Sequence, residues 1–174
     1  QYVYNKDSSV VTTGDPVISR TLQERLDENV SVRSFGANGD NSQQADKIQY
    51  AIDQLFANTD KTVPSSRVTL KIPAGQYQLN TSIKVPPHAN IIGDGSDKTI
   101  FIQTANEPVF ETVNDTRTPI DAGDQTSTTT LNQAREIKIE GMTLETTGDN
   151  IGLLLRDCAT VSYTHLRAHE TLLY

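Results

Sequence analysis

Short apolar stretches separated by turn-forming residues run through most of the chain from residue 68 onward. In 68–72, 77–79 and 82–85, apolar and polar residues alternate, which is typical of strands with one buried face. Short apolar stretches predict further strands at 91–92, 99–102, 108–110, 137–139, 142–144 and 151–155. Many short, closely spaced strands of this kind occur in sandwiches, barrels and solenoids.

The segment before residue 60 has a different pattern. Residues 30–35 alternate and predict a strand, and 36–41 form a cluster of turn-forming residues. A helix is predicted next, with Asn41 or Ser42 as its N-cap, because apolar residues then recur on one helical face. The residues on that face are Ala45, Ile48, Ala51, Ile52 and Leu55, with Phe56 beside them.

Two similar segments indicate how the strands are connected. In 91–95 and again in 139–144, apolar strand residues lead to a glycine, where the chain can turn a corner with positive φ. Repeated corners of this kind favour a solenoid, in which each coil stacks its inward-facing Ile, Val and Leu on the next coil. An amphipathic helix with one apolar face is suited to cover the first coil.

Four motifs follow one another between residues 30 and 105. They are VSVRSFGANGD at 30–40, KIQYAID at 47–53, a strand followed by PAGQY at 73–77, and IIGDGS at 91–96. In this order they resemble the opening of the pectate-lyase-like β-helix proteins. That family writes the first motif as V-x-V-x-D/S-F-G-A-x-G-D-G and usually has an acidic T-D-D-T before the helix. The chain has NSQQ at 41–44 instead, where Asn41 and Ser42 can still cap the helix.

The resemblance implies an all-β fold, the N-terminal coils of a right-handed parallel β-helix with an N-terminal capping helix. Residues 30–160 are then the start of the β-helix domain. Residues 1–29 are expected to be a linker or virion-attachment-like lead-in that ends in a short helix, whose apolar stripe is Leu22, Leu26 and Val30. Residues 114–130 are rich in Thr, Asp and Ser and are expected to form a loop between strands.

The pectate-lyase-like superfamily includes pectin and rhamnogalacturonan enzymes, epimerases, and phage tailspikes that bind or cleave surface polysaccharides. Residues 20–26 are polar and lie directly before the first motif, which is similar to the phage arrangement. The resemblance implies a tailspike or tail-fibre protein in the virion tail, homotrimeric at full length, that recognises a host polysaccharide with or without cleaving it. Two alternatives stay open: a secreted cellular enzyme similar to pectate lyases and polygalacturonases, and a non-catalytic structural β-helix of the virion.

Composition narrows the range of partners. The net charge is −7 and no Lys/Arg cluster occurs, so a nucleic-acid partner is not expected. No apolar run approaches the length of a membrane span. Only 35% of the residues are hydrophobic and 6% are aromatic, which favours a β-rich surface over a helical bundle. The single cysteine, Cys158, is expected to be a small buried apolar residue.

No catalytic residue can be nominated from the sequence, and whether the chain is an enzyme stays open. An active member of this family would be a polysaccharide lyase or a glycoside hydrolase; a lyase would use Ca²⁺, and no other cofactor or metal is expected. His88 is interpreted as a surface loop residue. The acidic residues near turns are interpreted as solvated turn acids. They are Asp94, Asp97, Asp121, Asp124, Glu140, Glu145, Asp149 and Asp157.

Residues 161–174 are predicted to be a non-native tail. VSYTHLRAHET at 161–171 resembles one reading frame of a common transposase sequencing adapter, and LLY would follow from an index barcode. In that frame the preceding codon can encode only Ser, Pro, Thr or Ala, and Thr160 satisfies this condition. His165 and His169 have the i, i+4 spacing of a helical metal pair, with Glu170 beside them. The adapter resemblance argues against a zinc site there.

Overall fold

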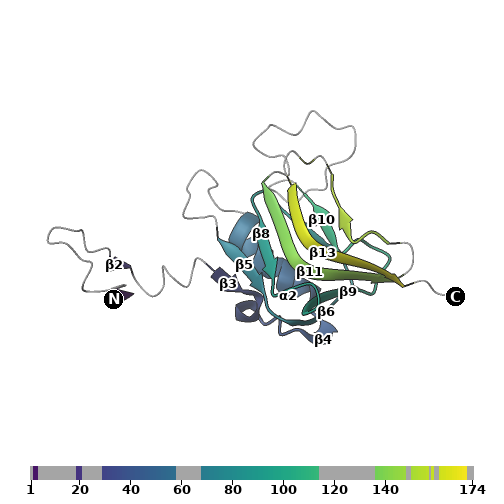
Figure 1. Ribbon diagram of the computed structural model, residues 1–174, viewed down its shortest axis with the longest axis horizontal. Coiled ribbons are helices and arrows are strands. Elements are labelled where there is room, and N and C mark those ends of the chain that lie inside the picture. Colours follow the sequence, from purple (N-terminus) through teal and green to yellow (C-terminus); the bar gives the residue numbers. More distant parts are fainter. Residues whose placement is uncertain are drawn as a thin grey trace.

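The computed structural model describes residues 2–3, 19–20, 29–57, 68–113, 136–147, 150–156, 158 and 161–171. These residues are mostly β-strand, with one short α-helix (Figure 1). A two-stranded antiparallel pair, β1 (Tyr2–Val3) and β2 (Ser19–Arg20), comes first. The other elements, in chain order, are β3 (Asn29–Ser31), η1 (Val32–Phe35), β4 (Asp40–Gln43), α2 (Ala45–Ile52), η2 (Asp53–Ala57), β5 (Thr69–Ile72), β6 (Gly75–Leu79), β7 (Ile83–Val85), β8 (Asn90–Gly93), β9 (Thr99–Gln103), β10 (Phe110–Thr112), β11 (Ile137–Thr147), β12 (Leu153–Leu154) and β13 (Val161–Thr171).

Parallel strands form two further sheets. The smaller sheet has the order β12-β10-β7. The larger one runs β3-β5-β8-β11-β9-β6-β4, and β13 pairs with β11. The long strand β11 pairs with β8 through its first residues and with β9 through its last residues, so the sheet curls at β11. Figure 1 shows β11 and β13 side by side as two long, bent strands.

Successive groups of three strands stack on one another. β5 pairs with β8, β6 with β9 and β7 with β10, so each strand lies beside the strand three positions later in the chain. Paired residues keep the same side inward: Leu70 lies opposite Ile91, and Tyr77 lies opposite Phe101. This repeat places apolar residues in continuous rows, because side chains on a strand alternate between its two faces.

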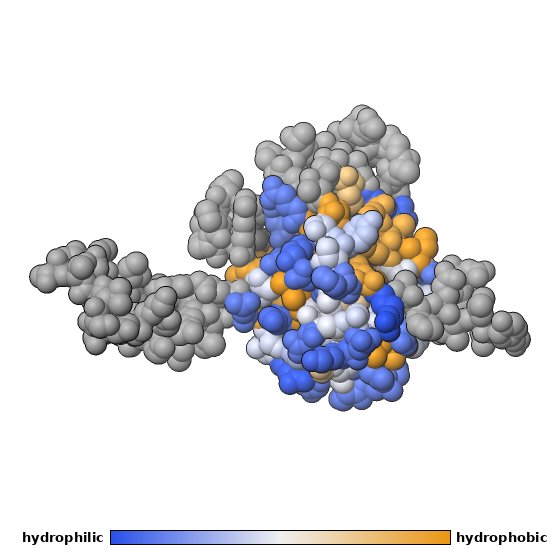
Figure 2. All heavy atoms as spheres, in the orientation of Figure 1, coloured by the Kyte–Doolittle hydropathy of each residue, from blue (hydrophilic) through white to orange (hydrophobic). Residues whose placement is uncertain are grey.

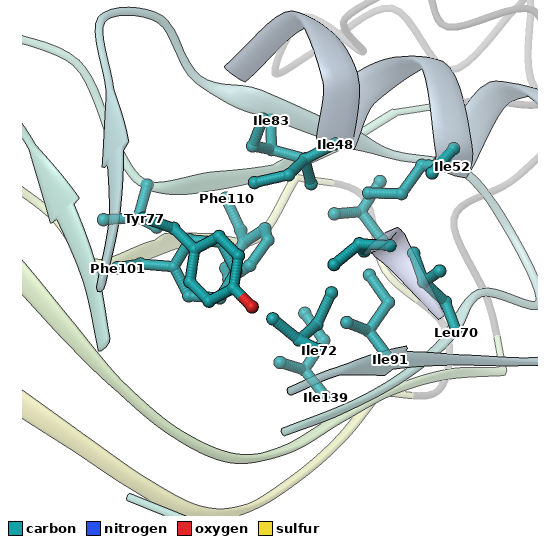
Figure 3. Close-up of a cluster of buried hydrophobic side chains, with 14 of the residues drawn as sticks. Ile48, Ile52, Leu70, Ile72, Tyr77, Ile83, Ile91, Phe101, Phe110 and Ile139 are labelled. Carbon is teal, nitrogen blue, oxygen red and sulfur yellow. The ribbon is translucent and has the colours of Figure 1, made fainter. Parts of the chain in front are cut away.

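The apolar core fills the space enclosed by the strands and α2 (Figure 3). Phe101 stacks on Tyr77, with ring centroids 5.4 Å apart, and meets Phe110 edge-on at 5.2 Å. The hydroxyl of Tyr77 donates a hydrogen bond to the Pro73 carbonyl oxygen at 2.8 Å, and burial raises the pKa of Tyr77. Rows of Ile, Leu and Val from neighbouring strands complete the core, including Ile72, Ile91 and Ile139.

Glycines lie at the corners, and the positive φ predicted there occurs at Gly141 but not at Gly93. Gly141 has φ 71° within β11, at the bend of that strand. A side chain on Gly93 would place its Cβ 2.2 Å from the Gly141 carbonyl oxygen. The backbones at Gly93 and Gly141 are therefore too close for any residue other than glycine at position 93. The Gly141 carbonyl oxygen also accepts a hydrogen bond from the Gly95 amide at 2.9 Å.

The predicted helix is present and covers one end of the stack. Ile48 and Ile52 of α2 are fully buried, while Leu55 is half-buried in the π-helical turn η2. The helix packs against β6, β7 and η1. The Gln49 side chain makes two hydrogen bonds to the backbone of Lys84 in β7, at 3.1 Å and 2.7 Å. These bonds close the edge of the smaller sheet.

Two predictions about this region are wrong. The strand expected over 30–35 ends at Ser31 and continues as the 3₁₀ turn η1, which Gly36 terminates with φ 87°. The helix N-cap is Gln44, whereas Asn41 and Ser42 lie in β4. The Gln44 side chain accepts a hydrogen bond from the Gly39 amide at 3.1 Å, which ties the helix start to the preceding turn.

The later strands agree with the prediction in position and differ at their ends. The strand expected at 108–110 begins at Phe110, and that expected at 151–155 is limited to Leu153–Leu154. The strands expected at 137–139 and 142–144 form one strand, β11. The predicted loop at 114–130 and the predicted helix through Leu22 and Leu26 lie outside the described residues. Within the described part of the chain, no helix is long and apolar enough to span a membrane.

Hydrophilic residues cover much of the face seen in Figure 2, with hydrophobic patches between them. The large hydrophobic side chains that are most exposed are Tyr50 on α2, Ile151 and Leu155 beside β12, and Tyr163 on β13.

Candidate functional site

A row of charged side chains crosses the outer face of the smaller sheet. Lys84 and Glu111 are the central residues of β7 and β10 and lie directly opposite each other. The ammonium group of Lys84 forms an ion pair with Glu111 Oε2. Arg156, which follows β12, places its Nε 3.0 Å from Glu111 Oε1. This second contact is an ion pair without the alignment of a hydrogen bond. Glu111 therefore lies between two cations from the coils on either side.

The side chains in this row differ in their exposure. Glu111 is only 8% exposed, and it is the one buried charged residue in the described ranges. Lys84 and Arg156 keep 30% and 37% of their side chains exposed. A buried carboxylate is tolerated when opposite charges contact it, and the outer parts of both cations remain open to solvent. A ligand on this sheet would meet these cations first.

The backbone next to Arg156 is held in place by β10. The Arg156 amide donates to the hydroxyl of the buried Thr112 at 2.8 Å, and that hydroxyl lies 3.2 Å from the Arg156 carbonyl oxygen. The Cys158 thiol lies 3.1 Å from the same hydroxyl. Cys158 packs against the core but is only half-buried, so the expectation of a small buried apolar residue is met in part. These contacts fix the position of the Arg156 backbone, from which its side chain extends toward Glu111.

Two of the predicted turn acids make different kinds of contact. Asp94 accepts a hydrogen bond from the Ala74 amide at 3.0 Å, joining one corner to the corner before it, which agrees with its interpretation as a turn acid. Asp97 is exposed in its turn, as expected, but it forms an ion pair with Arg167 of β13 at 3.0 Å in place of the predicted bond to the backbone.

The acids on β11 lie on its outward face. Glu140 contacts Lys138 at 3.0 Å and accepts a hydrogen bond from Thr164 at 3.1 Å. The hydrogen bond with Lys138 lowers the pKa of Glu140. Glu145 is half-buried on the same strand. Four further predicted acids lie outside the described residues: Asp121, Asp124, Asp149 and Asp157.

His88 lies in the turn between β7 and β8, as expected, but its side chain is only 8% exposed. Its Nδ1 lies 2.8 Å from Glu136 Oε2, next to the start of β11. Both residues have positive φ, 64° for His88 and 51° for Glu136. The prediction of a surface loop residue is right about the loop and wrong about the exposure of the side chain.

Residues 161–171 form a strand, so His165 and His169 are not on a helix. In a strand, residues four apart are separated by about 13 Å, too far for a shared metal ion. Within the described ranges, no three His, Cys, Asp or Glu side chains gather to hold a metal. The strand's inward positions carry Val161 and Leu166, opposite Ile137 and Met142 of β11.

Glu111 was absent from the acids considered in the sequence. The sequence around Glu111 shows only that it lies between Phe110 and Thr112 in a short strand. It does not show the two cations that contact Glu111, because they come from positions 84 and 156. Only the stacking of three coils brings these residues together. The described residues bring two cations to this buried acid, whereas a hydrolase of the two-carboxylate type would need a second acid there.

Comparison with known proteins gives two matches. Residues 29–165 match the profile of a family described as rhamnogalacturonase A/epimerase, pectate lyase-like. Among solved structures, the fold is similar to that of a protein of Geobacillus virus E2, ORF18, with a TM-score of 0.62 and 23% sequence identity. The match covers 80% of this chain and 25% of the phage chain, so this chain spans about a quarter of that protein's length. No curated protein matches the chain significantly.

Proposed function

The chain belongs to the rhamnogalacturonase A/epimerase, pectate lyase-like family, and from this we propose that it is part of a phage tail protein. In this proposal the chain forms the first coils of a right-handed parallel β-helix. The complete protein is a tailspike or tail fibre that recognises a polysaccharide on the host surface. It is a homotrimer located in the virion tail.

The stacked parallel strands support the β-helix. β5, β6 and β7 form one coil, β8, β9 and β10 form the next, and α2 covers the edge of the first. The polar segment 20–26, which lies shortly before the motif at 30–40, supports the phage setting. The similarity of the fold to a longer phage protein, of which the match covers 25%, supports it further.

The row of Lys84, Glu111 and Arg156 supports a glycan as the ligand. Its two partly exposed cations can donate hydrogen bonds to sugar hydroxyl or carboxylate oxygens. The single observation that carries this part of the proposal is that the row crosses one parallel sheet. A sheet surface of this kind suits an extended chain of sugars, and three such surfaces in a trimer would multiply weak contacts.

The test begins with the complete open reading frame from the source DNA. Its product is examined by sedimentation and by binding to capsule and lipopolysaccharide of the host, alongside depolymerase assays on the same glycans. We expect a trimer that binds host glycan, with weaker binding in the Lys84→Ala and Arg156→Ala variants. Lys98→Ala, an exposed lysine on a corner of the larger sheet, is the matched control.

A second function is favoured by the family's own description, which names a rhamnogalacturonase and an epimerase. A monomer that cleaves polygalacturonate or rhamnogalacturonan would replace the phage proposal with a secreted cellular enzyme. A trimer without affinity for any glycan would identify a structural part of the virion. A signal peptide upstream would support the enzyme, and a virion-docking domain would support the tail protein.

A further inference from the structure

The turn between η1 and β4 contains an Asn-Gly pair, Asn38–Gly39, with the Asn38 side chain exposed. Glycine lacks a side chain, so its backbone nitrogen is easily reached by the side chain of the residue before it. We propose that Asn38 is a latent deamidation site, and that the buried side chain of Gln44 protects it while this turn is folded. The inference is independent of the proposed function.

The reaction needs only water and base. The Gly39 nitrogen loses its proton to hydroxide and attacks the Asn38 side-chain carbonyl carbon. A new carbon–nitrogen bond closes a succinimide ring, and the bond to the side-chain amide nitrogen breaks. The departing nitrogen takes a proton from water and leaves as ammonia, which restores the hydroxide. Water then opens the ring at either carbonyl, giving aspartate or isoaspartate. No oxidation or reduction takes place.

The folded structure keeps the Gly39 nitrogen away from this reaction. Its N–H donates a hydrogen bond to Gln44 Oε1 at 3.1 Å, and its carbonyl oxygen accepts one from the Gln76 amide at 3.0 Å. A Cβ added to Gly39 would lie 2.9 Å from the Gly75 Cα, so these two backbones are in close contact. Gly39 therefore cannot rotate toward Asn38 without separating from the next coil.

Gln44 is well placed to act as the protecting residue. It is only 1% exposed, and its side-chain amide nitrogen contacts Asp40 Oδ1 and lies 3.2 Å from the Ser42 hydroxyl. These contacts orient its oxygen toward the Gly39 N–H. The protection depends on an acceptor at this position, because the hydrogen bond holds the proton that must leave before attack.

Conversion at Asn38 would alter the first turn permanently. Isoaspartate passes the backbone through its Cβ, which lengthens the chain between Ala37 and Gly39. The longer chain would displace Gly39 and disturb its close contact with Gly75. Asn38 could therefore react irreversibly whenever the turn opens, and the amount of converted Asn38 would increase with the frequency of opening.

The experiment follows deamidation at mildly alkaline pH by peptide mapping with mass spectrometry. It compares the native chain, the same chain in urea, and a Gln44→Leu variant whose folding is checked by circular dichroism. Asn38→Ser assigns the signal, and the exposed Asn29, which precedes the β-branched Val30, is the internal reference. We expect slow conversion of Asn38 in the native chain and rapid conversion in urea. In folded Gln44→Leu we expect a rise of about fivefold over the native chain.

Equal rates at Asn38 in the native and unfolded chain would overturn the proposal, as would a folded Gln44→Leu variant with the native rate. If Gln44→Leu does not fold, hydrogen exchange of the Gly39 amide in the parent chain at low urea decides. Conversion that rises in step with exchange at Gly39 supports the proposal. Conversion that stays constant while exchange rises contradicts it.

Discussion

The side-chain amide of Gln49 takes the place of a strand beside Lys84. Its nitrogen donates to the Lys84 carbonyl oxygen at 3.1 Å, and its oxygen accepts from the Lys84 amide at 2.7 Å. A neighbouring β-strand would supply the same two bonds. An open strand edge invites pairing with other chains, so one glutamine on the covering helix protects the first coil.

Replacing Gln49 with Leu should destabilise the chain by about 1–3 kcal/mol, because both backbone groups of Lys84 then lack their partner. Urea denaturation of the parent and the variant measures this loss. Gln43→Ala is the control, because Gln43 makes an exposed hydrogen bond to Thr104 and should change stability by about 0.5 kcal/mol or less. Equal effects of the two substitutions would mean that Gln49 does not protect the edge.

Ile52→Asp tests the helix as a cover. Ile52 is fully buried in the core, so an aspartate there would place an unpaired charge among apolar side chains. We expect a loss of roughly 3 kcal/mol or more in the free energy of unfolding. Gln54→Asp, at an exposed position in the following turn, should be nearly neutral. A stably folded Ile52→Asp chain would show that the helix is not needed to close the stack.

Removing the Glu111 carboxylate should leave two cations facing one apolar position. Glu111→Leu is therefore expected to lower the free energy of unfolding by about 1–3 kcal/mol. The loss is limited because solvent screens the partly exposed charges of Lys84 and Arg156. Glu111→Gln should lose less, because its amide oxygen can still accept hydrogen bonds. Thermal melts at low and high salt check this, and a variant as stable as the parent at low salt would contradict it.

Glu107 links stability to pH. Its Oε2 accepts a hydrogen bond from the Ser82 amide at 2.8 Å, which lowers the pKa of Glu107 below its ordinary value of 4.5. A lowered folded pKa adds stability above the unfolded value, and this contribution disappears as pH falls through the folded value. Parent and Glu107→Gln chains should differ in melting temperature near neutral pH and converge below pH 4.5. A difference that stays constant across this range would exclude the linkage.

Truncation after residue 159 tests the adapter prediction for 161–174. If these residues are a non-native tail, the fragment 1–159 and the full chain should melt at the same temperature within error. The structure also gives a physical reason to expect a loss of stability on truncation, because β13 pairs with β11 along most of its length. A clear loss on truncation would contradict the prediction. The adapter match itself is checked by sequencing the source DNA with the adapter trimmed.

Much of this fold could be read from the sequence, because glycine corners and alternating apolar residues carry local information. Gly93, Gly141 and the face with Ile48 and Ile52 all lie where the pattern predicted them. The 3₁₀ turn at Val32 was not predicted, because it depends on one side-chain hydrogen bond that the alternating pattern does not reveal. The Ser31 side chain accepts a hydrogen bond from the Arg33 amide and bends a segment whose alternation indicates a strand.

The candidate site was far harder to predict than the fold. Glu111 becomes distinctive only when Lys84 and Arg156 lie beside it, and neither residue is near it in the sequence. The N-cap was missed for a related reason. Gln44 acts through the Gly39 amide and is buried by its neighbours, whereas Asn41 and Ser42 merely have the residue types that cap helices most often.

The spacing between paired residues has a consequence for how this molecule can vary. Leu70 pairs with Ile91, Tyr77 with Phe101 and Ile83 with Phe110, so the sequence separation widens at each successive strand of the coil. The strands stay in register, and the additional residues lie at the corners. New loops can therefore be inserted between strands without disturbing the ladder. Mutation can change the loops at these corners while the paired strands stay the same, and new binding specificities can arise there at little risk to folding.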